Sequence, residues 1–137
     1  MTLKEIMKKN IVTITPDMSV REAAKKMKDE NIGCILVTEN GSLRGILTDR
    51  DITCMIVADG KDPNYTMVKE IMNGDVVYTS PDTDILEAFK IMAGHKIRRL
   101  PLKFDGRLEG IVSISDLAPV LKSEMDNFFN VEEIYHH

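Results

Sequence analysis

The amino-acid sequence predicts an α+β protein that consists of two pseudo-symmetric βαββα repeats. Three observations lead to this prediction. The chain matches itself at a fixed shift, each copy has a helix-start signal after a short extended stretch, and each copy has a turn signal between two apolar stretches. Two copies are too few for a solenoid, so a pair related by a pseudo-two-fold axis is the expected architecture.

The internal repeat covers most of the chain without a gap. Residues 3–52 align with 68–117, and 17 of these 50 positions are identical. Each copy opens with the same lead-in segment, Lys-Glu-Ile-Met, whose charged pair we expect to be exposed. The repeat divides the chain into a first domain at 1–65, a second domain at 66–124 and a C-terminal tail at 125–137.

Each copy begins with an extended apolar stretch and continues with a helix. The stretches at 11–14 and 76–79 run into a Thr-Pro or Ser-Pro pair, and a residue before proline avoids the helical region. Ser19 and Asp84 are good helix N-caps, and a glutamate follows each of them at the spacing of a capping box. Apolar residues then recur at helical intervals in both copies.

Two short strands and a second helix complete each copy. The predicted strands are 34–37 and 44–47 in the first copy, and 99–103 and 109–112 in the second. An Asn-Gly pair and an Asp-Gly pair stand between the strands, and both are typical of tight hairpin turns. The second helices are expected to begin near Asp49 and Ile114.

Composition and charge narrow the class of protein. The formal net charge is -4, which provides no basic field for nucleic acid or anionic lipid, and no apolar run could cross a bilayer. The first ten residues lack the apolar core of a signal peptide. We expect a cytoplasmic protein in which Cys34 and Cys54 are reduced, partly buried thiols. The final His136 and His137 are native or the remnant of a tag, and they support no inference.

Catalytic motifs are not visible in the sequence. It has no nucleophile elbow, no Walker-type phosphate loop, no metal-ligand cluster and no recognisable triad. The sequence therefore predicts a protein that is not an enzyme and has no resident cofactor or metal.

Both copies carry one motif where the last strand meets the second helix. Gly45-Ile46-Leu47-Thr48-Asp49-Arg50-Asp51 and Gly110-Ile111-Val112-Ser113-Ile114-Ser115-Asp116 share a glycine, two apolar residues, Thr or Ser, two variable residues and Asp. With the order of elements, this motif resembles the CBS domain, and two in tandem resemble a Bateman module. Ile97-Arg98-Arg99-Leu100-Pro101 is similar to the stretch before the family's second strand. The resemblance covers Leu3 to about Leu121.

The resemblance implies a fold, a ligand and an assembly. CBS pairs pack sheet to sheet and associate as homodimers, and their clefts hold adenosine compounds. AMP, ADP or ATP is the expected ligand, and NAD or S-adenosylmethionine the less common one.

Carried over residue by residue, the resemblance implies a nucleotide site in the second repeat. Ser113 caps a helix whose N-terminal N–H groups favour phosphate, and Asp116 accepts from the ribose hydroxyls. Ser115 donates to ribose or phosphate, and Arg98 contacts phosphate. The adenine edge is bound by the backbone of Tyr78, Thr79 and Ser80. The corresponding residues of the first repeat are Thr13, Ile14, Thr15, Thr48, Arg50 and Asp51.

The two predicted sites differ in charge. Gly33 stands in the first repeat where the second has Arg98. Arg50 replaces part of that cationic contribution at most, so we expect the second site to bind more tightly.

Structural explanations stand beside these assignments. Ser or Thr at a helix start with Asp three residues later is also a plain capping pair, and Arg98-Arg99 also suit a solvated strand edge.

The alternative function is a ligand-free protein-interaction or dimerisation module with an unidentified protein partner. Aromatic tail residues either help such a dimer or fold back onto their own chain: Phe128, Phe129 and Tyr135. Inward-pointing arginine and serine groups favour the ligand, whereas salt-bridged or outward groups favour the alternative.

Overall fold

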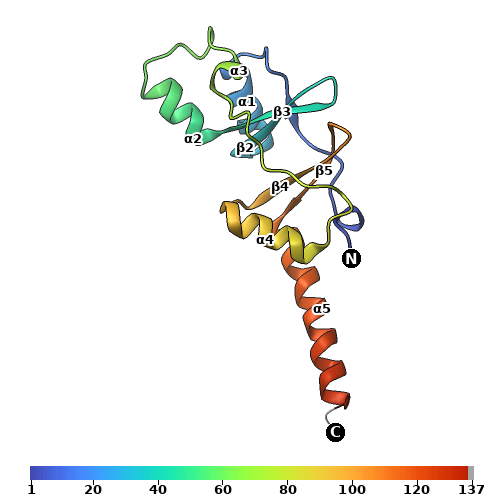
Figure 1. The fold of residues 1–137 in the computed structure, drawn as a ribbon. Helices are drawn as coiled ribbons and strands as arrows, with labels where there is room; N and C mark the ends of the chain where they lie inside the picture. Colours follow the sequence, from blue (N-terminus) through green and yellow to red (C-terminus); the bar gives the residue numbers. More distant parts are fainter. Residues whose placement is uncertain (136–137) are drawn as a thin grey trace. The chain divides into compact units, whose positions relative to one another are not determined.

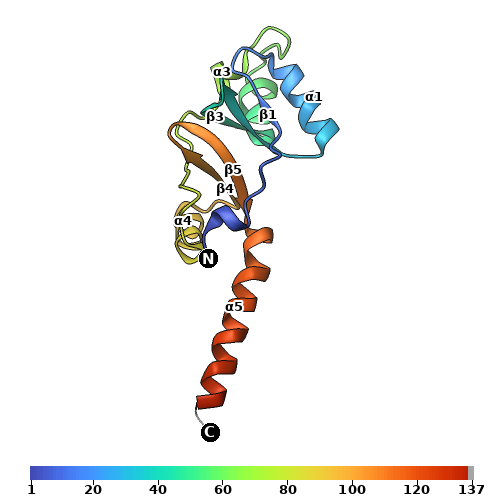
Figure 2. The same ribbon diagram turned by 90° about the vertical axis from the view of Figure 1, so that its right-hand side faces the viewer.

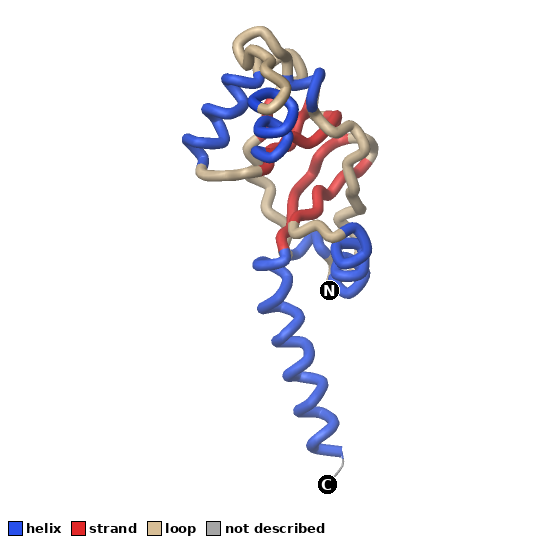
Figure 3. Tube along the Cα trace, turned by 90° about the vertical axis from the view of Figure 1, so that its left-hand side faces the viewer, coloured by secondary structure: helices blue, strands red, loops and turns tan. Residues whose placement is uncertain are grey.

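The computed structural model describes residues 1–135, which form two compact units (Figure 1). We name them by the repeat that dominates each. The first-repeat unit holds residues 11–76 and 105–108, and the second-repeat unit holds 1–10, 77–104 and the chain from Glu109 onward. Both units combine helices with strands (Figure 3), so the predicted α+β class with two repeats is confirmed.

The first-repeat unit is built around a small mixed sheet. Its elements are β1 (Thr13–Ile14), α1 (Val20–Glu30), β2 (Cys34–Glu39), β3 (Ser42–Thr48), α2 (Asp49–Ile52), the π-helix η2 (Thr53–Val57) and α3 (Val68–Ile71). β1 pairs with β2 in parallel, and β2 pairs with β3 antiparallel. Apolar residues of α1 pack against the sheet in one core with Ile35, Val37 and Leu47.

The second-repeat unit has the same plan with a shorter first strand. Its elements are η1 (Leu3–Glu5), α4 (Ile85–His95), β4 (Arg99–Phe104), β5 (Arg107–Ser113) and α5 (Ile114–Tyr135). A single parallel bridge between Thr79 and Leu102 takes the place of the first strand. The start of β5 lies among residues 105–108 of the first-repeat unit, where Arg107 pairs with Ser42.

Local sequence signals set the helix starts and the hairpin turns as predicted. The Ser19 hydroxyl accepts from the Glu22 N–H at 3.1 Å. Asp84 also caps its helix, but it accepts from the Leu86 N–H, one residue earlier than a capping box requires. Both turns have positive φ at their two central residues, for example 52° at Asn40 and 82° at Gly41, as a type I′ hairpin needs.

Helix α5 is longer than the sequence suggested. The predicted tail continues the helix as far as Tyr135 (Figure 2). Phe128 and Phe129 are 63% and 57% exposed, so they do not fold back onto their own chain. The Tyr135 side chain and residues His136 and His137 lie outside the described part of the chain. None of the described helices combines the length and hydropathy of a membrane span.

The lead-in segments are exchanged between the repeats. Leu3, fully buried, belongs to the core of the second-repeat unit, and Val68, equally buried, belongs to the core of the first-repeat unit. The Lys4 N–H donates to the Pro81 carbonyl at 2.8 Å, and the Lys69 N–H donates to the Pro16 carbonyl at 3.0 Å. Their Lys-Glu pairs are exposed, as predicted. Each repeat therefore completes its core with the segment that precedes the other repeat in the sequence.

Candidate ligand-binding site

The predicted Ser-Asp pair of the second repeat lies at the junction of β5 and α5. Ser113 ends the strand, and Asp116 lies in the first turn of the helix. The Asp116 N–H donates to the Ser113 hydroxyl at 3.2 Å, which is the predicted capping contact. Ser113 and Asp116 are half-buried, whereas Ser115 is exposed. All three are thus open to solvent at a helix N-terminus.

Arg98 joins this group through its backbone. The Ile114 N–H donates to the Arg98 carbonyl at 2.9 Å, which fixes the residue before β4 beside the first residue of α5. The Arg98 side chain is exposed, and it forms no ion pair with any residue that the structure describes. The chain therefore fixes the backbone of Arg98 at the helix start where phosphate was predicted to bind, and its exposed side chain extends from that point.

Lys8 contacts the predicted site, although the sequence did not point to it. Its Nζ lies 3.3 Å from Asp116 Oδ1. Two backbone hydrogen bonds, of 2.9 and 3.0 Å, hold Lys8 to Ile111 of β5, and Asn73 is held to Ile46 in the same way in the other unit. The repeat alignment places Lys8 opposite Asn73, but only the exchange of lead-in segments brings Lys8 to Asp116.

The environment of Asp116 lowers its pKa. Partial burial alone would raise the pKa of this carboxyl group, because burial disfavours the charged form. Hydrogen bonds from Ser113 and Lys8, together with the Lys8 charge, outweigh burial and hold the pKa below its ordinary value of 3.8. Asp116 is therefore an anion at neutral pH with partners within the chain. By the criterion given above, the salt bridge of Asp116 and the exposed side chains of Arg98 and Ser115 favour the structural explanation, whereas the lack of an ion pair at Arg98 among the described residues leaves that cation available to a ligand.

The predicted adenine-binding segment, Tyr78–Ser80, runs beside β4. The Thr79 N–H donates to the Pro101 carbonyl at 3.1 Å, and the Thr79 carbonyl accepts from the Lys103 N–H at 2.9 Å. Because amide groups alternate in direction along an extended chain, those of Tyr78 and Ser80 point away from β4. The Tyr78 ring is half exposed, and Lys103 Nζ lies 3.8 Å from its centre. The Ser80 carbonyl accepts from the Thr83 N–H at 3.1 Å, so the Tyr78 amide groups and the Ser80 N–H are the backbone groups that remain for an adenine edge.

The matching residues of the first repeat form a more closed set. Thr48 and Asp51 make a complete capping box: the Thr48 N–H donates to Asp51 Oδ2 at 2.9 Å, and the Asp51 N–H donates to Thr48 Oγ1 at 3.1 Å. The Ile14 side chain is buried in the core, which leaves only its backbone for a ligand. Lys26 Nζ already donates to the Thr13 carbonyl at 2.9 Å. Arg50 is exposed, and Thr15 is also exposed, directly after β1.

Strand register sets the distance between the two ends of the predicted first site. Thr13 lies opposite Leu36 on β2, and Thr48 lies opposite Cys34 on the same strand. Two strand spacings and two residues of rise place Thr13 and Thr48 about 12 Å apart. An extended adenosine monophosphate can span this distance.

Cys34 is half-buried as predicted, but Cys54, in η2, is exposed, which corrects the expectation of partial burial.

The starts of helices α2 and α5 differ in one pair of residues that are joined by a backbone hydrogen bond. In the first-repeat unit the Asp49 N–H donates to the Gly33 carbonyl at 2.9 Å, just as Ile114 donates to Arg98. The Asp49 carboxylate fills the space beside Gly33, since a β-carbon there would stand 2.8 Å from Asp49 Oδ2. Its other oxygen accepts from the Arg50 N–H at 2.8 Å. An anion of the chain itself thus occupies the helix start where the second repeat offers Arg98.

Comparison with known proteins agrees with this geometry. The family model described as the CBS domain matches twice, at residues 3–57 and 68–123. The CBS domain-containing protein YhcV of Bacillus subtilis is 41% identical over 117 residues, which cover 85% of this chain and 83% of that protein. Hypoxic response protein 1 of Mycobacterium tuberculosis is 31% identical over 118 residues, which cover 85% and 82%.

Solved structures show the same relationship. Hypoxic Response Protein I (HRPI) with two coordinated zinc ions has a TM-score of 0.78 at 31% identity, with 87% of this chain and 98% of that chain covered. A hexameric CBS-CP12 protein from bloom-forming cyanobacteria has a TM-score of 0.70 at 32% identity, with 86% and 70% covered. Two matches to the family model, at the two repeats found in the sequence, establish that this chain belongs to the CBS-domain family and carries the domain twice in tandem.

Proposed function

We propose that this chain is a non-catalytic regulatory module of the cytoplasm that binds an adenosine compound such as AMP, ADP or ATP. The tighter site is that of the second repeat. Ser113, Ser115 and Asp116 face the ribose and phosphate, Arg98 and Lys8 supply positive charge, and the backbone beside Thr79 meets the adenine. NAD or S-adenosylmethionine is the less favoured ligand.

The observation that carries this proposal is the contrast between the two helix starts. Arg98 and Ile114 in the second repeat occupy the positions of Gly33 and Asp49 in the first. Asp49 places a carboxylate on the Arg50 N–H, whereas Ile114 has no acceptor for the matching Ser115 N–H and Arg98 adds a cation. Helix N-termini favour anions, so phosphate binds better at α5 than at α2.

Lys8 fits the same role. A lysine that bonds Asp116 from an exposed position can turn to a phosphate without unfolding, because its backbone is held by Ile111 and not by its side chain. A bound nucleotide then exchanges the Lys8–Asp116 ion pair for one contact to ribose and one to phosphate. This exchange connects the lead-in segment to ligand binding, which is the kind of linkage that a regulatory module needs.

A thermal shift assay on the whole chain tests the proposal. AMP, ADP, ATP, NADH and S-adenosylmethionine are each added at rising concentration. A ligand at 100 times its Kd should stabilise the folded chain by about 2.7 kcal/mol. AMP, ADP or ATP is expected to give the largest shift. No shift with any of the five compounds would refute the proposal and favour a ligand-free module.

A separate observation favours the interaction module as the second candidate. Beyond Leu121, helix α5 exposes apolar side chains that no described residue covers, and helical spacing places Met125 and Phe128 on the same face as Leu121. Phe129 and Val131 widen this apolar face. Exposed apolar faces of this kind commonly mark interfaces, and we propose a second copy of the chain as the occupant, in a homodimer.

Sedimentation measures this second candidate directly. At micromolar concentration the parent chain is expected to sediment as a dimer, and a chain that ends at Ser123 is expected to sediment as a monomer. A monomeric parent chain would refute the homodimer. Nucleotide binding by the shortened chain then decides whether the ligand site depends on the assembly.

A further inference from the structure

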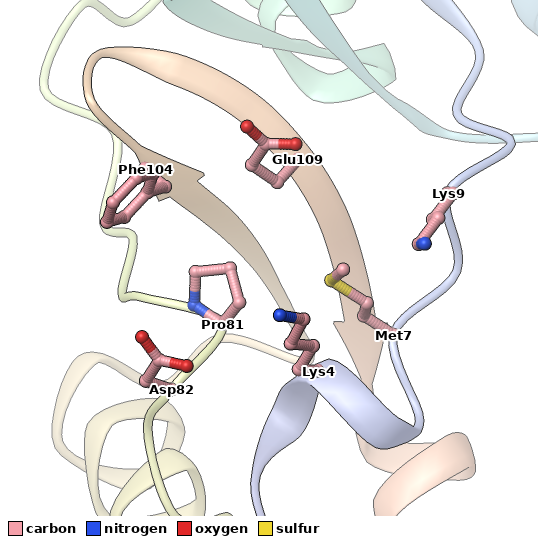
Figure 4. A pocket seen from close by; sticks show the side chains of 7 residues that line it. All are labelled: Lys4, Met7, Lys9, Pro81, Asp82, Phe104 and Glu109. Atoms are coloured by element: carbon pink, nitrogen blue, oxygen red, sulfur yellow. The ribbon is translucent and has the colours of Figure 1, made fainter.

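We infer that the second-repeat unit holds a second binding site, for a small zwitterion with an apolar body such as a free α-amino acid. The site is a pocket of about 350 Å³ between the lead-in segment, residues 81–82 and the β4–β5 hairpin (Figure 4). We call it the lead-in pocket. None of the residues assigned above to nucleotide binding lines it.

The walls of the lead-in pocket are fixed to one another. The Lys4 N–H donates to the Pro81 carbonyl at 2.8 Å, which joins two of its sides. The third side is joined by the paired hydrogen bonds between Lys8 and Ile111. Met7, which lines the floor, packs against Gly110 of β5. The cavity is therefore formed before any ligand arrives, which lowers the cost of binding.

The lining combines an apolar floor with a charged rim. Met7, Pro81 and Phe104 supply the apolar surface. Figure 4 shows two ammonium groups and two carboxylates around it, contributed by Lys4, Lys9, Asp82 and Glu109. Among the described residues, none of these four has an ion-pair partner.

The first repeat uses the same positions differently. Lys69 and Asp17, which match Lys4 and Asp82, form an ion pair of 3.1 Å. Arg44 and Glu39, which match Glu109 and Phe104, form another of 3.5 Å. In the first repeat the charges neutralise one another across these positions. In the second repeat, Phe104 replaces the partner of Glu109, and Lys4 and Asp82 keep the residue types of the first repeat but form no ion pair with a described residue, so their charges remain for a ligand.

The rim defines the chemistry of the ligand. Two cations and two anions favour a molecule that carries both charges, with its carboxylate on a lysine and its ammonium on Glu109 or Asp82. Its apolar body then rests on the methionine, proline and phenylalanine of the floor. About 350 Å³ is near the lower limit of ligand pockets, roughly 300–1,000 Å³, so a single amino acid fits better than a nucleotide. Since the rim is open to solvent, we expect millimolar affinity.

Calorimetry on the full chain with L-phenylalanine and L-leucine tests this site. Phenylacetate and phenethylamine, which each keep one of the two charges, serve as matched probes. At least one of the amino acids is expected to bind, and each single-charge analogue of phenylalanine to bind about tenfold more weakly or not at all. Absence of binding by both amino acids at tens of millimolar, or equal binding by the analogues, would overturn the inference.

Variants that copy residues of the first repeat locate the site. The double change Phe104→Glu and Glu109→Arg introduces the ion pair of the first repeat, which that repeat already tolerates at these positions. It should abolish amino-acid binding and leave the melting temperature and AMP binding unchanged. Glu109→Gln, a smaller change, should weaken amino-acid binding severalfold. Unchanged amino-acid binding in both variants would show that the lead-in pocket is not the site.

Discussion

The thioether sulfur of Met7 lies 2.6 Å from the point where a β-carbon on Gly110 would stand. Met72 and Gly45 form the same contact in the other unit, with 2.7 Å between the corresponding points. Each methionine comes from a lead-in segment and each glycine from the last strand of a repeat. The glycine of the family motif is thus the place where the exchanged segment packs closely on the sheet.

Alanine at these glycines should destabilise the chain. Gly45→Ala also meets the Asn73 backbone carbonyl at 3.0 Å, whereas the contacts around Gly110 are all to one flexible side chain. We expect a loss of about 1–3 kcal/mol for Gly45→Ala and a smaller loss for Gly110→Ala. Urea denaturation measures both. Gly94→Ala, in an open position on helix α4, is the control and should stabilise the chain by about 0.5–1 kcal/mol. Equal stability of all three variants would contradict the close packing.

Lys96 offers a stabilising change. It ends α4 in the left-handed region with φ 55°, where Asn31 ends α1 with the same φ. Asparagine tolerates this conformation better than lysine, so Lys96→Asn should raise the free energy of unfolding by about 0.5–1 kcal/mol. The reciprocal Asn31→Lys should lower it by a similar amount. Thermal denaturation of the pair checks both signs, and a loss of stability in Lys96→Asn would contradict the argument.

Removal of the two motif aspartates should affect nucleotide binding unequally. Asp116→Ala removes a charged hydrogen-bond acceptor, worth about 1.5–3 kcal/mol, so the affinity should fall roughly 10- to 100-fold. Asp51→Ala should matter less, because we propose that the first site is the weaker one. Both aspartates accept helix-capping hydrogen bonds or lie in capping pairs, so melting temperatures must be compared as well. Calorimetry that finds equal losses in the two variants would refute the asymmetry.

An exchange of residues between the repeats should move the phosphate preference. Gly33→Arg together with Asp49→Ile gives the first helix start the residues of the second, whereas the single change Gly33→Arg would have to displace the Asp49 carboxylate. The double variant should gain roughly tenfold in affinity for AMP at the first site, and Arg98→Ala should lose a similar factor at the second. Adenosine, which lacks phosphate, should be nearly unaffected by either change. An equal effect on AMP and adenosine would show that Arg98 does not act on phosphate.

Lys8→Asn should raise the pKa of Asp116 toward its ordinary value. The parent carboxyl group titrates below 3.8, so the unfolded chain takes up this proton first as the pH falls. Its stabilisation is complete at neutral pH and is lost as the pH falls below 3.8 through the folded pKa. Because Lys8 is largely exposed, the contribution should be below about 1 kcal/mol. Carboxyl NMR titration measures the pKa, and an unchanged value in the variant would show that Lys8 is not the cause.

We expect the two backbone hydrogen bonds of the lead-in segment to form in the Lys8→Asn variant as well. Asn73, the residue that matches Lys8, makes the same two hydrogen bonds to its own strand partner. Lys8→Asn therefore separates the side-chain charge from the backbone contact. Lys8→Gln, which keeps more of the length of the side chain, is the matched control, and the two variants should shift the Asp116 pKa alike.

The sequence by itself determined the features that depend on neighbours in the chain. A serine or aspartate a few residues before a helical turn caps it wherever the helix lies, and Asn40-Gly41 turns the chain whatever packs on it. The same holds for the Thr48–Asp51 capping box, whose two hydrogen bonds span three residues. The family motif was readable for this reason, and with it the two helix starts.

Only the tertiary structure decided where the lead-in segments pack. Their Lys-Glu-Ile-Met sequences are identical, so either segment has the side chains to fill either core, and local propensity cannot choose between them. The choice depends on contacts distant in sequence, such as Lys8 with Ile111 and Leu3 with the core around Ile85. The Lys8–Asp116 ion pair and the lead-in pocket both follow from that exchange. The length of α5 could not be predicted from the sequence either. A helix that packs no face against the rest of the chain does not need apolar residues at regular helical intervals, and that pattern is what predicts a helix.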